Sequence, residues 1–124
     1  RTPAAPSEWP DSDLVDENGE PRFVYHFTNE TGKRGISASR LLMPGGSGLV
    51  YFSNLPYPTA EQAQRALSLP RTPSGFYAIP RQNVPGALAW GPVEPNFGQP
   101  GGGLEASFPG VVPLEGAQWF PVKP

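Results

Sequence analysis

The 124-residue sequence contains no cysteine, one histidine and one methionine. Without cysteine, neither a disulfide framework nor a cysteine–zinc site can form, and a single histidine does not supply the ligands of a metal centre with ordinary spacing. No apolar run approaches the roughly 20 residues that a membrane-spanning helix requires. These absences exclude a disulfide scaffold and the usual zinc sites, and they predict no transmembrane helix.

Charge is also scarce in this chain. Lys, Arg, Asp and Glu make up 16% of the residues, whereas about a quarter is typical of a soluble domain. The formal net charge is −2, and the basic residues do not gather in a stripe that could follow a phosphate backbone. The sequence therefore gives no electrostatic support for nucleic-acid binding.

Proline and glycine are abundant instead, with 18 and 15 residues. Such a composition often indicates disorder. However, 37% of the residues are apolar, and three Trp, four Tyr and seven Phe are spread along the chain, which is enough to build a core. We therefore expect one domain of short strands, tight turns and ordered loops.

By composition the chain divides into two regions. Residues 1–20 combine a proline-rich start with an acidic stretch, which predicts a linker whose Trp9 packs back onto the domain. Residues 21–124 are predicted to form the folded domain. Because the start is proline-rich and lacks an initiating Met, we expect the chain to be the C-terminal part of a larger protein.

Strand and helix signals alternate at first and then give way to strands. The first predicted strand, residues 21–28, places two sets of side chains on opposite faces. The sets are Phe23, Tyr25 and Phe27 on one face and Val24, His26 and Thr28 on the other. Short helices are predicted at residues 32–40 and 60–69, the second of which begins with a Thr59–Gln62 capping box. Further strands or extended segments are predicted at residues 49–53, 75–79, 87–90, 105–108, 111–114 and 118–122, so that the order indicates an α+β fold.

Few chemical mechanisms fit the polar residues of this chain. No serine lies in the Gly-x-Ser-x-Gly pattern of a nucleophile elbow, and the glycine-rich residues 45–48 lack the lysine of a phosphate-binding loop. What remains is His26, Tyr51 and the carboxylate Glu105, which follows three consecutive glycines. Taken singly, each has an ordinary structural explanation: a half-buried histidine, a strand aromatic and a loop carboxylate. Their joint occurrence favours a site.

The residues around His26 and Tyr51 follow a distinctive order. They are Tyr25-His26-Phe27-Thr28, then Gly32, Gly35-Ile36 and Ser39, and then Val50-Tyr51-Phe52-Ser53. This half of the chain resembles the diphtheria-toxin type of ADP-ribosyltransferases, in which a Tyr-His strand precedes a Gly-Ile helix and a second strand ends in an aromatic pair. The particular residue pattern is similar to that of the bacterial polymorphic-toxin branch of the same superfamily.

The second half contains the most specific stretch of the sequence. It reads Asn96-Phe97-Gly98-Gln99-Pro100-Gly101-Gly102-Gly103-Leu104-Glu105. This stretch resembles the catalytic loop of the tuberculosis-necrotising-toxin type of NAD glycohydrolases, which has a Gln where Glu105 stands here. Together the two resemblances span about residues 23–67 and 76–114.

The resemblance implies an ADP-ribosyltransferase-like α+β fold of two small antiparallel sheets and two short helices, with an NAD cleft between the sheets. By position, His26 would bind the adenosine-side ribose of NAD. Tyr51 would stack on the nicotinamide ring. Glu105 would bind the 2′-hydroxyl of the nicotinamide ribose and act as the catalytic acid residue.

The same resemblance implies further NAD contacts. The backbone of Phe27 or Thr28 would recognise the amide group of nicotinamide. The backbone of Gly103 would approach NAD closely. Apart from the resemblance, we expect Arg40 or Arg34 to pair with the pyrophosphate, because they follow the first predicted strand. The family commonly has a second nicotinamide-stacking tyrosine on the helix after the second strand, and the corresponding helix here has none.

We therefore expect a mono-ADP-ribosyltransferase toxin domain, because Glu105 in place of Gln favours transfer. An NAD glycohydrolase that uses water as the acceptor is the first alternative, and a non-catalytic protein-interaction module is the second. As implied by the resemblance, the domain would take NAD as substrate, modify a macromolecular acceptor and bind a cognate immunity protein, with no membrane partner. It would be a secreted or contact-delivered effector acting in the target-cell cytoplasm, as in interbacterial competition.

Overall fold

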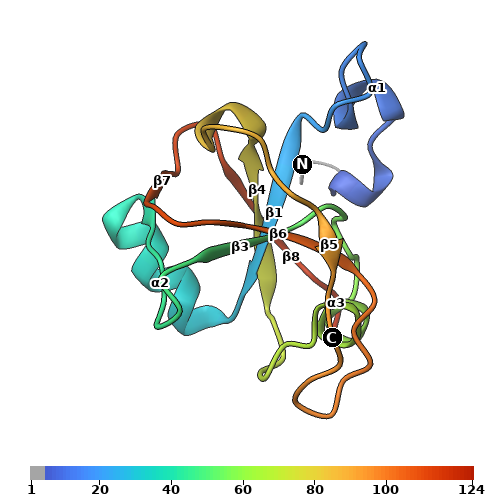
Figure 1. Ribbon diagram of the computed structural model, residues 1–124, viewed down its shortest axis with the longest axis vertical. Helices are drawn as coiled ribbons and strands as arrows, with labels where there is room; N and C mark the ends of the chain where they lie inside the picture. Colours follow the sequence, from blue (N-terminus) through green and yellow to red (C-terminus); the bar gives the residue numbers. More distant parts are fainter. Residues whose placement is uncertain (1–4) are drawn as a thin grey trace.

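A six-stranded antiparallel sheet forms the centre of the computed structural model, which describes residues 5–124 (Figure 1). Its strand order is β5-β6-β3-β1-β4-β8. The strands are β1 (Phe23–Thr28), β3 (Val50–Ser53), β4 (Gly75–Pro80), β5 (Gly91–Pro92), β6 (Leu104–Phe108) and β8 (Gln118–Pro121). A second sheet pairs β2 (Leu41–Leu42) with β7 (Val112–Pro113). The predicted α+β class is confirmed.

Two helices follow the first two long strands, as the sequence predicts. Helix α2 (Glu30–Ser39) begins where the Asn29 side chain accepts a hydrogen bond from the Gly32 amide. Helix α3 (Ala60–Leu67) begins where the Thr59 hydroxyl accepts one from the Gln62 amide. Because the side-chain cap satisfies an amide that has no partner within the helix, each cap fixes where its helix starts. Both helices end at a residue in the left-handed conformation, Arg40 for α2 and Ser68 for α3.

The helices cover opposite faces of the six-stranded sheet, and the alternation of β1 decides which side chains meet which helix. On one face, Ile36 of α2 packs against a cluster that contains Val24, and on the other face Ala63 of α3 lies in a cluster with Tyr25 and Phe27. Figure 1 shows α2 and α3 on opposite sides of the sheet. The predicted alternation along β1 is confirmed.

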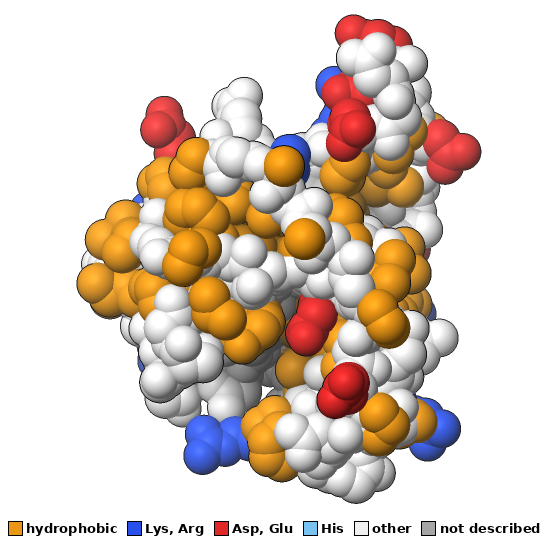
Figure 2. Space-filling view, viewed as in Figure 1, with side chains coloured by type: hydrophobic (Ala, Val, Ile, Leu, Met, Phe, Trp, Pro, Cys, Tyr) orange, Lys and Arg blue, Asp and Glu red, His pale blue; other side chains and the backbone are white. Residues whose placement is uncertain are grey.

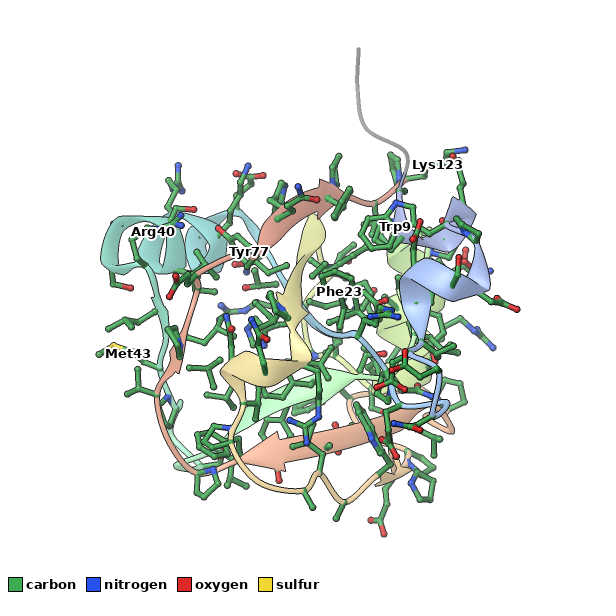
Figure 3. All side chains as sticks on the ribbon, turned by 90° about the horizontal axis from the view of Figure 1, so that it is seen from above. Trp9, Phe23, Arg40, Met43, Tyr77 and Lys123 are labelled. Atoms are coloured by element: carbon green, nitrogen blue, oxygen red, sulfur yellow. The ribbon has the colours of Figure 1, made fainter. Side chains whose placement is uncertain are left out.

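The segment before β1 folds against the domain. It contains a short 3₁₀ helix η1 (Pro6–Glu8) and one turn of helix, α1 (Asp11–Leu14). The Trp9 ring contacts those of Phe23 and Phe120, with centroids 5.3 and 5.8 Å apart, and Figure 3 shows it on the side of Phe23. The predicted packing of Trp9 is thus confirmed, whereas residues 1–4 of the predicted linker lie outside the described residues.

Smaller features of the fold differ from the sequence expectations. Residues 87–90 have no regular structure, and the strand lies at β5, directly after them. A second 3₁₀ helix, η2 (Arg81–Asn83), follows β4. Within the part of the chain that the structure describes, no helix has the length and apolar character needed to cross a membrane.

Candidate functional site

The central strands β1 and β3 separate at one end of the sheet. Their backbone ladder pairs Tyr25 with Ser53 and goes no further. Beyond this pair, Nδ1 of His26 lies 2.9 Å from the Tyr51 carbonyl oxygen. Because a carbonyl can only accept, Nδ1 carries the proton and Nε2 of the neutral ring is left as an acceptor. The histidine side chain thus bridges the strands where the ladder stops.

This separation also leaves backbone groups of Phe27 facing the gap. The amide of Arg81 donates to the carbonyl of Arg22, so Arg22 faces β4. Backbone groups of successive residues on an antiparallel strand point to alternate neighbours. The odd-numbered residues of β1 therefore point toward β3, and Phe27 would pair with Tyr51 if the ladder continued. Its amide and carbonyl face the opening instead.

A pocket of about 180 Å³, the inner pocket, occupies this opening. Three of the residues that line it are those singled out from the sequence, namely His26, Tyr51 and Glu105. Its complete lining is Tyr25, His26, Phe27, Tyr51, Phe52, Ser53, Leu67, Leu69 and Glu105. Four of these nine residues, Phe27, Phe52, Leu67 and Leu69, are purely apolar, so His26, Tyr51 and Glu105 are partly shielded from water.

Glu105 reaches the pocket from β6. It lies directly opposite Ser53 on β3 and Gly91 on β5. Burial raises the pKa of the Glu105 carboxyl above its ordinary value of 4.5, because desolvation disfavours the charged form. Burial also lowers the pKa of His26, and the hydrogen bond to Tyr51 opposes that shift. The inner pocket therefore combines a neutral imidazole with a partly desolvated carboxyl group.

Tyr51 joins the inner pocket to a larger one. Its side chain is 42% exposed, whereas the adjacent Phe52 is buried in the core, as the predicted alternation requires. Tyr51, Leu67, Leu69 and Glu105 line both the inner pocket and a second pocket of about 560 Å³, the outer pocket. The two pockets therefore form one continuous cleft with Glu105 at their junction.

The outer pocket is bounded by the end of α3 and the hairpin between β5 and β6. Besides the shared residues, its lining consists of Ser68, Pro70, Pro92, Val93, Glu94, Pro95, Asn96 and Phe97. Neither pocket is lined by a Lys or Arg side chain. In Figure 2, acidic side chains lie on the face over β5 and β6, and the basic side chains lie toward its edges. The cleft is therefore anionic.

The glycine-rich hairpin is docked on α3. The amides of Gly101 and Gly103 donate to the carbonyls of Arg65 and Ala66, at 2.9 and 3.0 Å, and so satisfy acceptors that a helix end leaves unpaired. Gly101 has a φ of +71°, and a Cβ there would lie 2.4 Å from the Val93 carbonyl oxygen. Glycine is required at this position on both counts. The hairpin thereby holds the start of β6, which carries Glu105, against α3.

Phe97 occupies the tip of this hairpin in an unusual conformation. Its φ is +52°, which is uncommon for a bulky residue, and its side chain is 60% exposed. The turn is held by mutual backbone hydrogen bonds between Asn96 and Gln99, and the Asn96 side chain accepts from the Phe97 amide. The turn therefore holds the backbone that carries this large apolar ring, and the ring lines the outer pocket.

Three other residues expected to contact NAD lie away from the pockets. The Thr28 carbonyl accepts a hydrogen bond from the Ser74 amide. The amide of Gly103 is bonded to α3, and a Cβ at Gly103 would lie 2.7 Å from the Tyr57 hydroxyl, so its close approach is to protein. Arg40 ends α2 and lines neither pocket, and Figure 3 shows it on α2, far from Trp9.

The position of the cleft also differs from the expectation. The resemblance implies a cleft between two sheets, but no residue of β2 or β7 lines either pocket. The cleft instead runs along the six-stranded sheet, because the gap arises where β1 and β3 diverge within that sheet. Sequence reasoning also missed the contributions of Ser68, Glu94 and Phe97. The available signal for Phe97 was an aromatic residue within a glycine-rich stretch.

Among residues 5–124, no group of three or more His, Cys, Asp or Glu residues could hold a metal ion. No family model, curated protein or solved structure matches this chain.

Proposed function

We propose that this domain cleaves the bond between nicotinamide and ribose in NAD and transfers ADP-ribose to an acceptor in a target cell. The observation that carries the proposal is the meeting of His26, Tyr51 and Glu105 in one pocket. These residues come from three different strands and were selected from the sequence for this chemistry. The resemblance to toxin ADP-ribosyltransferases supports the same activity, and with it a secreted or delivered effector and a cognate immunity protein.

The chemistry requires a negative group beside the ribose. As the nicotinamide leaves, positive charge develops on the ribose in an oxocarbenium-like transition state, and a carboxylate that faces this charge lowers the barrier. Glu105 offers such a carboxylate in surroundings that remove part of its water. Because the charge appears mainly in the transition state, the interaction accelerates the reaction rather than only tightening substrate binding.

The other residues would orient the substrate. The half-exposed ring of Tyr51 offers a face on which the flat, cationic nicotinamide stacks. The Phe27 amide and carbonyl, which face the gap, form a donor and acceptor pair that matches a carboxamide. His26 presents Nε2 as an acceptor for a ribose hydroxyl. No basic side chain lines the cleft, so the pyrophosphate of NAD lies toward solvent rather than in an arginine clamp.

The test is NAD turnover by the purified chain, with nicotinamide release measured by chromatography. Glu105→Gln keeps the size of the side chain and removes its charge, and we expect the rate of release to fall about 100- to 1,000-fold, the loss typical of a group that stabilises transition-state charge. Glu115→Gln is the matched control, because Glu115 is exposed and lines neither pocket. If Glu105→Gln and His26→Ala both left NAD consumption unchanged, the site assignment would be wrong.

The same incubation separates the alternatives. Rapid release of free ADP-ribose from NAD alone identifies an NAD glycohydrolase. Slow release, with labelled ADP-ribose transferred to a component of a cell lysate, identifies a transferase. Complete absence of turnover, with intact folding, supports a non-catalytic interaction module.

A further inference from the structure

The outer pocket is larger than the proposed reaction centre and opens directly onto it. Glu105 and Tyr51 line both pockets, so a group bound in the outer pocket would lie next to the ribose held at Glu105. Water attack does not require a recess of about 560 Å³ with an exposed aromatic ring in its lining. The space suits a larger acceptor.

We propose that the outer pocket binds the acceptor of ADP-ribose and that the accepting group is a guanidinium, as on an arginine side chain. This inference rests on the proposed function and names the class of its second substrate. It follows from the charge of the pocket, from its aromatic ring and from its rigid frame.

The charge of the outer pocket favours a cation. Its ionisable lining groups are Glu94, Glu105 and the phenol of Tyr51, and it has no Lys or Arg. Glu94 is exposed and lies within the hairpin between β5 and β6, whereas Glu105 is less exposed and lines both pockets. A cation that enters the pocket is therefore attracted by carboxylates at two depths and meets no like charge.

The exposed ring selects among cations. A guanidinium is planar, is weakly hydrated and stacks on aromatic faces, whereas an ammonium is a compact and strongly hydrated charge. Phe97 presents such a face, and a guanidinium stacked on it can still donate hydrogen bonds in its plane to a carboxylate such as Glu94. The pairing of an aromatic ring with a carboxylate therefore favours arginine over lysine.

These groups stand on a fixed backbone. The Ser68 hydroxyl donates to the Glu94 carbonyl at 2.8 Å, and the Gly102 amide donates to the Val93 carbonyl at 2.8 Å. The Asn96–Gln99 turn fixes Phe97 at a positive φ. Maintaining a strained, exposed aromatic residue has a cost, and such strain is concentrated at functional sites.

The transfer step balances without a further reactant. The bond between the nicotinamide nitrogen and ribose C1′ breaks, and its electron pair leaves on neutral nicotinamide. A guanidinium nitrogen bonds to C1′ and gives up one proton, first to a pocket carboxylate and then to solvent. The products are the ADP-ribosylated guanidinium, nicotinamide and one proton.

The test incubates the chain and NAD with agmatine, which carries a guanidinium, or with cadaverine, whose two charged groups are ammonium ions. Mass spectrometry measures the ADP-ribosyl adduct, and nicotinamide release is measured in the same reaction. We expect an adduct with agmatine at a level at least about tenfold above that with cadaverine. Glu94→Gln and Phe97→Gly should each lower the ratio of agmatine adduct to free ADP-ribose about tenfold.

The variants keep the result interpretable. Glycine adopts positive φ readily, so Phe97→Gly removes the ring while preserving the turn, and Glu115→Gln should leave the product ratio unchanged. Nicotinamide release without any agmatine adduct, or a product ratio that neither pocket variant changes, would overturn the guanidinium assignment and leave NAD cleavage standing. Absence of nicotinamide release from the folded wild-type chain would instead remove the proposed function and this inference with it.

Discussion

Two glycine-rich turns of this domain have similar compositions and different surroundings. Residues 45–48 connect β2 to β3, and an added Cβ at any of their three glycines would meet nothing within 4 Å. Residues 98–103 lie in the connection from β5 to β6, and there an added Cβ at Gly101 or Gly103 would meet the backbone or side chains of neighbouring segments at 3.0 Å or less. In the first turn glycine provides local freedom, whereas in the second it permits one segment to lie against another. Only the second turn leads to a carboxylate in a cleft.

Gly101→Ala should disrupt the docked turn and destabilise the fold more than alanine at any other glycine of the two turns. The new methyl group would stand 2.4 Å from the Val93 carbonyl oxygen, at a φ that alanine adopts poorly. We expect the free energy of unfolding to fall by about 2 kcal/mol or more, as is usual for a forced backbone rearrangement. Chemical denaturation measures this loss. NAD cleavage should fall as well, because the turn positions Glu105.

If Gly101→Ala lowered neither stability nor activity, the docking of the hairpin on α3 would not be what fixes the cleft. Gly98→Ala serves as the matched variant. Gly98 also has a positive φ, +73°, but a Cβ there meets nothing within 4 Å. It should therefore show the conformational cost alone, and the difference between the two variants reports the steric contact.

The docked turn also has an electrostatic consequence, because the residue that follows it is partly buried. The pKa of Glu105 is raised by burial, and the proposed chemistry needs the ionised form. NAD cleavage should therefore fall as the pH drops through a pKa above 4.5, rather than through the value of an exposed glutamate. A pH–rate profile measures the midpoint of this decrease. The residual activity of Glu105→Gln should not show the decrease at acidic pH.

The contribution of Glu105 to stability should change with pH in the opposite direction to its contribution to NAD cleavage. Because its folded-state pKa is raised above the unfolded value, its contribution is most favourable below the unfolded pKa and is lost as the pH rises through the folded pKa. Glu105→Gln should thus unfold at the same or a slightly higher temperature than wild type near neutral pH, since the carboxyl group is only partly buried. A marked decrease would show that Glu105 supports the fold rather than the reaction.

The contrast between the turns also separates what the sequence predicts from what it does not. Local signals, such as the Thr59–Gln62 capping box and the alternation along β1, predicted helix α3 and the two faces of β1, and a helix was also predicted where α2 lies. The exclusion of other mechanisms, together with the resemblance, selected His26, Tyr51 and Glu105, which the structure brings to one pocket.

Contacts between distant segments were not predictable in this way. The two-residue strands β2 and β5 exist through pairing rather than through their own residue preferences, whereas β7 lies within the predicted segment 111–114. Similarly, nothing local to Gly103 indicates that it faces α3 rather than a ligand, because that depends on where the helix end lies. The contributions of Ser68 and Glu94 to the outer pocket depend on the same docking.

Gly46→Ala, in the open turn, should have the smallest effect of these substitutions. Gly46 is exposed, its φ lies outside the positive region, and an alanine Cβ there would meet nothing within 4 Å. Replacing a glycine at a compatible position mainly restricts the unfolded chain, so the free energy of unfolding should rise by about 0.4–1 kcal/mol. Denaturation and NAD turnover, measured beside Gly101→Ala, should show unchanged activity. Loss of activity in Gly46→Ala would show that the open turn, and not only the docked one, takes part in the site.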